Sequence, residues 1–181
     1  NIGTYIVKDI NLGSRSSDSY SGLSEAISFS GIFYFSAYTG NYDYELWRSD
    51  GTEAGTYIVK DIQVGTQPSD PKNFIYFNNL IYFTANDGVN GKELWRSDGT
   101  ADGTYMVKDI NKGTSSSSPS SLYEFNGVLY FSAENSTYGR ELWRSDGTNA
   151  GTYIVKDINK GTISSSPSSL YEFNGVLYFS A

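Results

Sequence analysis

Three glutamates recur at one position of a repeated motif, ELWRSDGT, and carboxylates of this kind can hydrolyse glycosidic bonds. They are Glu45, Glu93 and Glu141. Two such side chains at a suitable separation would act as general acid and as base or nucleophile on a sugar. An active site is normally built once, whereas these residues return in every copy of the motif. We therefore interpret the three glutamates as structural.

The Asp-Gly turn of the same motif could bind Ca²⁺ through Asp50, Asp98 and Asp146. Ca²⁺ takes about six to eight oxygen ligands, so one Asp in each turn is too few without backbone and water oxygens. We predict no cofactor and a turn-stabilising role, because Ser, Asp and Thr bond readily to nearby backbone. The predicted turn residues are Ser49, Asp50, Gly51, Thr52, Ser97, Asp98, Gly99, Thr100, Ser145, Asp146, Gly147 and Thr148.

Three tryptophans, Trp47, Trp95 and Trp143, could stack on sugar rings. Each lies in the middle of the ELWRSD segment, at the same position of its unit. A bulky aromatic residue that returns in every unit is more typical of packing between units than of a single binding site. The pattern therefore predicts that the tryptophans pack between neighbouring repeats.

Positions that differ between the copies are better candidates for ligand binding. They gather in the segments YTGNYDY, NDGVNGK and ENSTYGR, which precede the three ELWRSD segments. Exposed tyrosines suit contact with protein or glycan, and Asp87 is isolated and lacks an EF-hand pattern. Asn135-Ser136-Thr137 is a formal glycosylation sequon, relevant only in a suitable secretory host. The predicted ligand-binding residues are Tyr38, Tyr42, Tyr44, Asp87 and Tyr138.

All of these residues belong to a repeat with a period of 48 residues. One complete unit reads SLYEF, VLYFSA, ELWRSD and TYIVKDI, four segments rich in aromatic and β-branched residues, which predict four strands, a to d. Ser30-Gly31, Asn78-Asn79, Asn126-Gly127 and Asn174-Gly175 separate the first two segments. Such pairs tolerate positive φ and predict tight a–b hairpins.

The repeat divides the chain into one domain, residues 1–181, with the following predicted parts. Residues 1–10 form the outer strand of a preceding unit, residues 23–62, 73–110 and 121–158 form three full units, and residues 169–181 supply the first two strands of a further unit. The sequence thus starts and ends within a unit, and we expect it to be an excerpt of a longer repeat protein.

The strands carry bulky apolar residues on both faces, so each small sheet must be covered on both sides. In VLYFSA, Leu129 and Phe131 alternate with Val128 and Tyr130. Stacking four-stranded antiparallel blades face to face satisfies this requirement. We therefore predict an all-β protein that forms part of a β-propeller, with strand a at the channel and strand d at the rim. A β-trefoil has no place for a fourth unit, and a linear stack of sheets is the alternative.

The residue composition excludes several kinds of site and partner. The 181 residues contain no Cys and no His, which excludes Cys/His zinc sites and Cys or His nucleophile–base pairs. The net charge of −7 argues against a nucleic-acid partner, which demands a basic surface. No stretch approaches the roughly 20 apolar residues of a membrane helix, so no transmembrane segment is expected.

The sequence ELWRSDGTxxGTYIVKDI resembles the ELWxxDGT repeat family of bacterial secreted or cell-surface proteins, and the resemblance extends over essentially the whole chain. It implies a repeat architecture and an extracellular or cell-surface location more than an activity. The SDGTxxGT turn is also weakly similar to the Asp-box turn of sialidase-like propellers, in which the Ser, Asp and Thr residues are structural.

These observations lead to three functional hypotheses. The first is a non-enzymatic extracellular module, structural or adhesive, that binds protein or polysaccharide through its loops. The second is part of a glycan-active enzyme whose catalytic residues lie outside this segment. The third is a subunit of a surface filament or sheath that self-assembles through open strand edges, such as the edge at Phe179.

Overall fold

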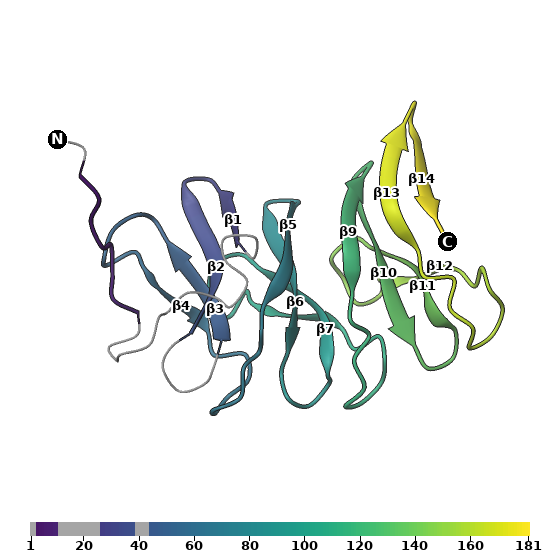
Figure 1. Ribbon diagram of the computed structural model, residues 1–181, viewed down its shortest axis with the longest axis horizontal. Coiled ribbons are helices and arrows are strands. Elements are labelled where there is room, and N and C mark those ends of the chain that lie inside the picture. The colour runs from purple at the N-terminus through teal and green to yellow at the C-terminus, as the bar shows by residue number, and fades with distance from the viewer. Residues whose placement is uncertain (1–2, 11–25, 39–43) are drawn as a thin grey trace.

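The computed structural model describes residues 3–10, 26–38 and 44–181, and over these residues the protein contains strands and no helix (Figure 1). The strands form three four-stranded antiparallel sheets and one two-stranded sheet. The four-stranded sheets follow the chain order a, b, c, d, and the two-stranded sheet consists of strands a and b. The prediction of an all-β protein built of four-stranded antiparallel blades, with a partial blade at the end, is confirmed.

The strand bounds repeat from blade to blade. Blade 1 consists of β1 (Ala26–Phe29), β2 (Ile32–Tyr38), β3 (Tyr44–Ser49) and β4 (Tyr57–Lys60). Blade 2 consists of β5 (Lys72–Phe77), β6 (Leu80–Asn86), β7 (Lys92–Ser97) and β8 (Tyr105–Lys108). Blade 3 consists of β9 (Ser120–Phe125), β10 (Val128–Asn135), β11 (Gly139–Ser145) and β12 (Tyr153–Lys156). The partial blade 4 consists of β13 (Ser168–Phe173) and β14 (Val176–Ser180).

The blades fan out from their first strands. Strand β1 lies against β5, β5 against β9, and β9 against β13, so the a strands form the inner side of the array. The fourth strand of each full blade, β4, β8 or β12, pairs only with its own third strand and lies at the outer side. This is the arrangement of a β-propeller, with strand a innermost and strand d at the rim.

Each a–b connection is a two-residue hairpin with positive φ at both central residues. In blade 3 these residues are Asn126 (φ 50°) and Gly127 (φ 73°), and the other three hairpins have the same conformation. Two positive φ values give a turn whose twist matches that of the flanking strands. The hairpins predicted from the Asn-Gly pairs are therefore confirmed.

The apolar core lies between the blades as well as within them. One cluster joins blades 1 and 2 and includes Leu46, Phe83 and Trp95. A second joins blades 2 and 3 and includes Leu94, Phe131 and Trp143. Trp95 of blade 2 and Trp143 of blade 3 therefore each pack in the seam with the preceding blade. Trp47 of blade 1 is also buried.

The c–d turn is held by its own side chains. In blade 2, Asp98 Oδ1 accepts hydrogen bonds from the backbone N–H of Thr100 (2.8 Å) and from its hydroxyl (2.7 Å). Thr100 Oγ1 in turn accepts from the N–H of Gly103 (3.0 Å), and Ser97 Oγ bonds to Thr104 Oγ1 (2.6 Å). Blades 1 and 3 repeat these contacts. These bonds hold the pKa of Asp50, Asp98 and Asp146 below its ordinary value.

Side chains of one blade reach the c–d turn of the next blade. Lys60 Nζ donates to the carbonyl of Thr104 (2.6 Å), and Lys108 Nζ donates to that of Thr152 (2.7 Å). Arg96 Nη1 donates to the carbonyl of Gly147 (3.1 Å). Two lysines of strand d therefore join neighbouring blades.

Residues 3–10 form no strand, in contrast to the outer strand predicted over residues 1–10. They nevertheless dock as strand d does, since Lys8 Nζ donates to the carbonyl of Thr56 (2.7 Å) in blade 1. A β-strand forms only where its backbone can hydrogen-bond to a neighbouring strand. Within the described residues none lies beside this segment.

The geometry of the c–d turn makes Gly103→Ala a destabilising substitution. A Cβ atom at this position would lie 2.0 Å from Asp98 Oδ1, so the carboxylate must leave its bonds to Thr100. Loss of hydrogen bonds to a charged group costs about 1.5–3 kcal/mol. We expect a free energy of unfolding lower by about 2 kcal/mol, measured by urea denaturation. Gly3→Ala, which meets no atom within 4 Å, is the control and should leave stability unchanged.

Candidate functional site

The b–c loops and the d–a linkers lie together at one end of the blades, opposite the a–b hairpins and c–d turns (Figure 1). We call this end the linker face. Its described parts are the loops 87–91 and 136–138 and the linkers 61–71, 109–119 and 157–167. The linker that enters a blade bonds to that blade's second strand, since Asn86 N–H donates to the carbonyl of Ser69 (2.9 Å) and Glu134 N–H to that of Ser117 (2.8 Å). The linkers therefore connect two blades each.

A buried glutamate anchors each linker. Glu93 is fully buried on β7. Its Oε1 accepts a hydrogen bond from the N–H of Ser117 (2.8 Å), and its Oε2 accepts from the N–H of Ile110 (3.1 Å) and from the hydroxyl of Ser117 (2.5 Å). One carboxylate thus holds two points of the linker, Ile110 just after strand d and Ser117 near the next blade.

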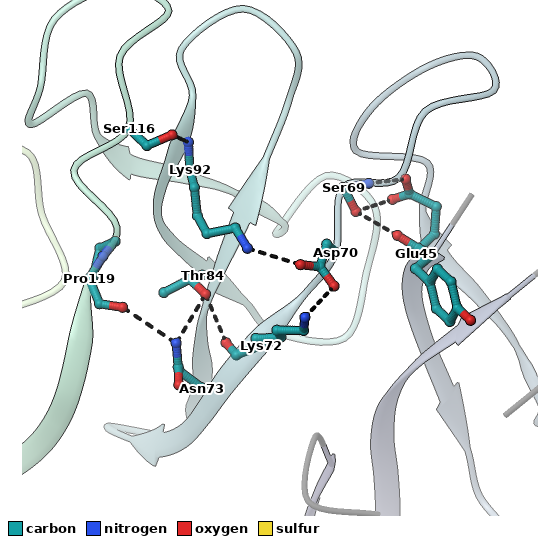
Figure 2. A network of polar contacts seen from close by, with 10 residues as sticks. Glu45, Ser69, Asp70, Lys72, Asn73, Thr84, Lys92, Ser116 and Pro119 are labelled. Carbon is teal, nitrogen blue, oxygen red and sulfur yellow. Dashed lines mark hydrogen bonds and ion pairs between the residues drawn. The ribbon is translucent and has the colours of Figure 1, made fainter. Parts of the chain in front are cut away.

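The other two glutamates repeat this arrangement, which we call the carboxylate clasp. Glu45 accepts from Ile62 and from both donors of Ser69, and Figure 2 shows the contacts with Ser69. Glu141 accepts from Ile158 and from both donors of Ser165. The three carboxylates that sequence alone could assign to catalysis each accept three hydrogen bonds from their own protein. Their arrangement is that of structural anchors.

Burial is the main cause of a raised pKa in two of the clasp glutamates, Glu45 and Glu93. Removal of the carboxyl group from water raises the pKa of Glu93 to about 7, and the hydrogen bonds from Ser117 and Ile110 limit the rise. Burial likewise raises the pKa of Glu45 to about 7, against the bonds from Ser69 and Ile62. Both side chains therefore titrate near neutral pH within the folded protein.

A second polar network lies beside the clasp of blade 1, where the linker enters blade 2 (Figure 2). The carboxylate of Asp70 forms ion pairs with Lys72 and Lys92, each at 2.9 Å. Asn73 Nδ2 reaches the carbonyl of Pro119 in the following linker at 3.4 Å. The network joins the linker, strand c of blade 2 and the entry to blade 3.

In blade 3, Arg140 takes the place of Lys92. Its guanidinium donates to the carbonyls of Ser118 (3.0 Å) and Ser117 (3.4 Å) and lies 3.6 Å from the carboxylate of Glu134. Sequence reasoning missed Lys92 and Arg140. Both are basic residues directly before the clasp glutamate and 48 residues apart, and this spacing is the signal that could have identified them.

The predicted ligand-binding residues have different positions in the structure. Tyr38 is only 7 % exposed, and its ring packs against that of Tyr44 with centroids 5.4 Å apart, so the expectation of an exposed ring is wrong for Tyr38. Tyr38 is the last residue of strand β2. Tyr138 is half-buried in the b–c loop of blade 3. Tyr42 lies outside the described residues.

The carboxylate of Asp87 accepts hydrogen bonds from residues of its own loop. Its Oδ1 accepts from the N–H groups of Val89 (2.9 Å) and Asn90 (2.7 Å), and its Oδ2 accepts from the Asn90 side chain (2.7 Å). Burial would raise the pKa of Asp87, but these hydrogen bonds together hold it below the ordinary value. The loop that carries the exposed Val89 is therefore shaped by Asp87. The described residues hold no group of three or more Asp, Glu, His or Cys side chains arranged to bind a metal, and none of their segments is a helix long and apolar enough to cross a membrane.

The clasp geometry predicts that Glu93→Gln destabilises the protein. Glutamine supplies one acceptor oxygen and one NH₂ group, so at least one of the three buried donors would face another donor. An unsatisfied buried group costs about 1–3 kcal/mol, and we expect a loss of that size in urea denaturation. Glu53→Gln, at an exposed position of the c–d turn, is the matched control. Equal stability of the two variants would contradict the clasp.

The raised pKa values also predict how stability depends on pH. The folded protein binds more protons at Glu45 and Glu93 than the unfolded chain does between the ordinary pKa of 4.5 and the folded value of about 7. The stabilisation is complete below pH 4.5 and is lost as the pH rises through 7. We expect a lower melting temperature at pH 8 than at pH 5, and a flatter profile for the double variant Glu45→Gln/Glu93→Gln.

No protein-family model and no curated protein matches the chain. Among solved structures, it is similar to a puromycin hydrolase mutant complexed with PGG, with a TM-score of 0.53 and 12 % identity. That match covers 86 % of this chain and 24 % of the hydrolase. An α-L-arabinofuranosidase from Clostridium thermocellum matches with a TM-score of 0.36 and 14 % identity, over 85 % of this chain and 58 % of that one. The chain spans about a quarter of the hydrolase, and this first likeness is one of fold alone.

Proposed function

We propose that this chain is a non-enzymatic repeat module of an extracellular or cell-surface protein, structural or adhesive, which binds protein or glycan through its linker face. The observation that carries the proposal is the use of the repeated carboxylates. Glu45, Glu93 and Glu141 accept three internal hydrogen bonds each, and the turn aspartates are bonded to their own threonines. The recurring acidic side chains are thus engaged in building the repeat.

The side chains of the linker face vary from blade to blade. The residue before the clasp glutamate is Tyr44, Lys92 or Arg140, and the loops 87–91 and 136–138 differ in length and composition. Val89 is exposed at the tip of one loop, and Tyr138 is half-exposed in the next. Loops on a rigid scaffold are the usual place for binding residues. The family resemblance of the ELWRSDGT motif supports the surface location.

If the chain binds through its linker face, alanine substitutions at two tyrosines of blade 3 should affect binding differently. We expect the chain to bind a component of a panel of surface polysaccharides and proteins, and Tyr138→Ala to weaken that binding by about tenfold or more. Tyr153→Ala is the matched control, because its ring lies at the c–d end of the same blade, under the Arg144 guanidinium. The measurement is biolayer interferometry after an array screen.

Three outcomes would count against the proposal. The first is binding that both substitutions weaken equally, and the second is an absence of binding across the panel. The third is release of reducing sugar from a bound polysaccharide, which would favour a glycan-active enzyme.

A further inference from the structure

Blade 2 departs from the repeat at four neighbouring positions where blades 3 and 4 both have serine. At these positions blade 2 has two charged side chains, an amide and a threonine. The residues of blade 2 are Asp70, Lys72, Asn73 and Thr84, and their counterparts are Ser118, Ser120, Ser121 and Ser132 in blade 3 and Ser166, Ser168, Ser169 and Ser180 in blade 4. A group of residues that occurs in one blade is the pattern expected of a binding site, which is built once.

The backbone that carries these residues has the same conformation in the blade that lacks them. Asp70 and Ser118 both have positive φ, 51° and 44°, and so do Asn73 and Ser121, 56° and 54°. Strand β5 pairs with β6 as β9 pairs with β10, with the register shift at the same place. Serines are therefore sufficient for this path of the chain, and the fold does not require the charged residues of blade 2.

The charged side chains of blade 2 converge at the linker face (Figure 2). Lys72 comes from β5 and Lys92 from β7, and both ammonium groups lie 2.9 Å from the carboxylate of Asp70 in the linker. The side chains of Lys72, Lys92 and Asp70 are 38 %, 29 % and 32 % exposed, so a ligand can reach all three. An ammonium group has three N–H donors, and one contact with Asp70 does not use all of them.

The amide of Asn73 is held next to these ion pairs. Its Nδ2 donates to the hydroxyl of Thr84 and to the carbonyl of Pro119, each at 3.4 Å. Thr84 is fully buried and donates in turn to the carbonyl of Lys72 (3.2 Å), whereas Asn73 is exposed. Thr84 therefore positions an exposed amide beside the lysines. We call Asp70, Lys72, Asn73 and Lys92 the blade 2 cluster.

The charges and hydrogen-bonding groups of the blade 2 cluster match an acidic saccharide. Two lysines and one carboxylate leave one excess positive charge, in a chain whose net charge is −7, and this excess favours an anionic group of a ligand. The carboxylate of Asp70 offers acceptors and the amide of Asn73 belongs to a group that both donates and accepts, which suits hydroxyls. A uronic acid unit brings a carboxylate and several hydroxyls on one ring. An acidic peptide would bring carboxylates against Asp70 without those hydroxyls.

We propose that the blade 2 cluster binds a uronic acid unit of an acidic polysaccharide, with the sugar carboxylate at Lys72 and Lys92 and the sugar hydroxyls at Asp70 and Asn73. This inference rests on the proposed function, because it names the ligand class of the linker face. The cluster lies at the inner side of that face, since β5 is one of the innermost strands. Because opposite charges supply part of the attraction, the affinity falls as the salt concentration rises.

The test compares the complete chain with variants that carry the repeat's own residues. Lys72→Ser and Asn73→Ser each introduce the residue that blade 3 has at that position, so both variants should fold and keep the melting temperature of the unchanged chain. Lys112→Ser removes an exposed lysine from the next linker and is the control with the same change of charge. Calorimetry with oligomers of galacturonate, glucuronate and mannuronate should show binding of at least one. Lys72→Ser should weaken that binding by about tenfold or more, and Lys112→Ser should leave it unchanged.

Two further ligands separate the contributions of charge and hydroxyls. The methyl ester of the bound oligomer keeps the hydroxyls and loses the charge, whereas polyglutamate keeps the carboxylates and lacks the sugar ring. Each should bind at least about tenfold more weakly than the uronate oligomer. Equal binding of either one would overturn the inference. So would a failure of all three uronate oligomers to bind, or an equal loss of binding in Lys72→Ser and Lys112→Ser.

The same variants distinguish this inference from the proposed function. A surface component whose binding is weakened by Tyr138→Ala and unchanged by Lys72→Ser would overturn the role of the blade 2 cluster and leave the proposed function standing. An absence of binding to every component, the uronate oligomers included, would overturn both.

Discussion

A buried carboxylate that accepts three hydrogen bonds is the interaction on which this array of blades depends. The glutamate lies on strand c, but its partners lie at the beginning and near the end of the linker to the next blade. The linker serine also accepts a bond from the second strand of that next blade. One side chain therefore fixes the path of the chain between blades. An apolar residue at this position would leave three buried donors without partners, which is costly in a low-dielectric interior.

The clasp also explains why residues with catalytic chemistry recur without forming an active site. Carboxylates at the same position of every blade meet the same donors in every blade, so their environment repeats along with the sequence. Strand c has the same sequence, ELWRS, from this glutamate to its end in all three blades, whereas the residue before the glutamate and the b–c loop vary. In blades 2 and 3 that neighbouring residue, Lys92 or Arg140, bonds to the linker as well. The linker face is thus a hydrogen-bonded backbone frame that carries different side chains in each blade.

The period, the strands and the a–b hairpins could be predicted from sequence because their causes are local. Asn126 and Gly127 both tolerate the positive φ that a tight hairpin turn requires. The apolar residues on both faces of VLYFSA must be covered on both sides of the sheet. The partners of Glu93 could not be predicted, because they lie 17 and 24 residues away in a Ser-rich stretch that resembles a spacer. The inter-blade role of Lys108 was missed because its acceptor is a backbone carbonyl 44 residues away, which no sequence pattern marks. The burial of Tyr38 was missed because a loop-like composition surrounds it.

The contacts across each seam have a direction. Lysine, arginine and tyrosine of one blade reach the c–d turn of the blade that follows it in the chain. A blade emerging from the ribosome therefore has its own strands before it has the turn that satisfies these side chains, and it waits for about one further repeat. At ~5–20 residues per second this delay lasts a few seconds. Translation would complete the blades in order, because the side chains of each blade gain their partners when the next blade folds. The most recently made blade would be the one exposed to chaperones and proteases.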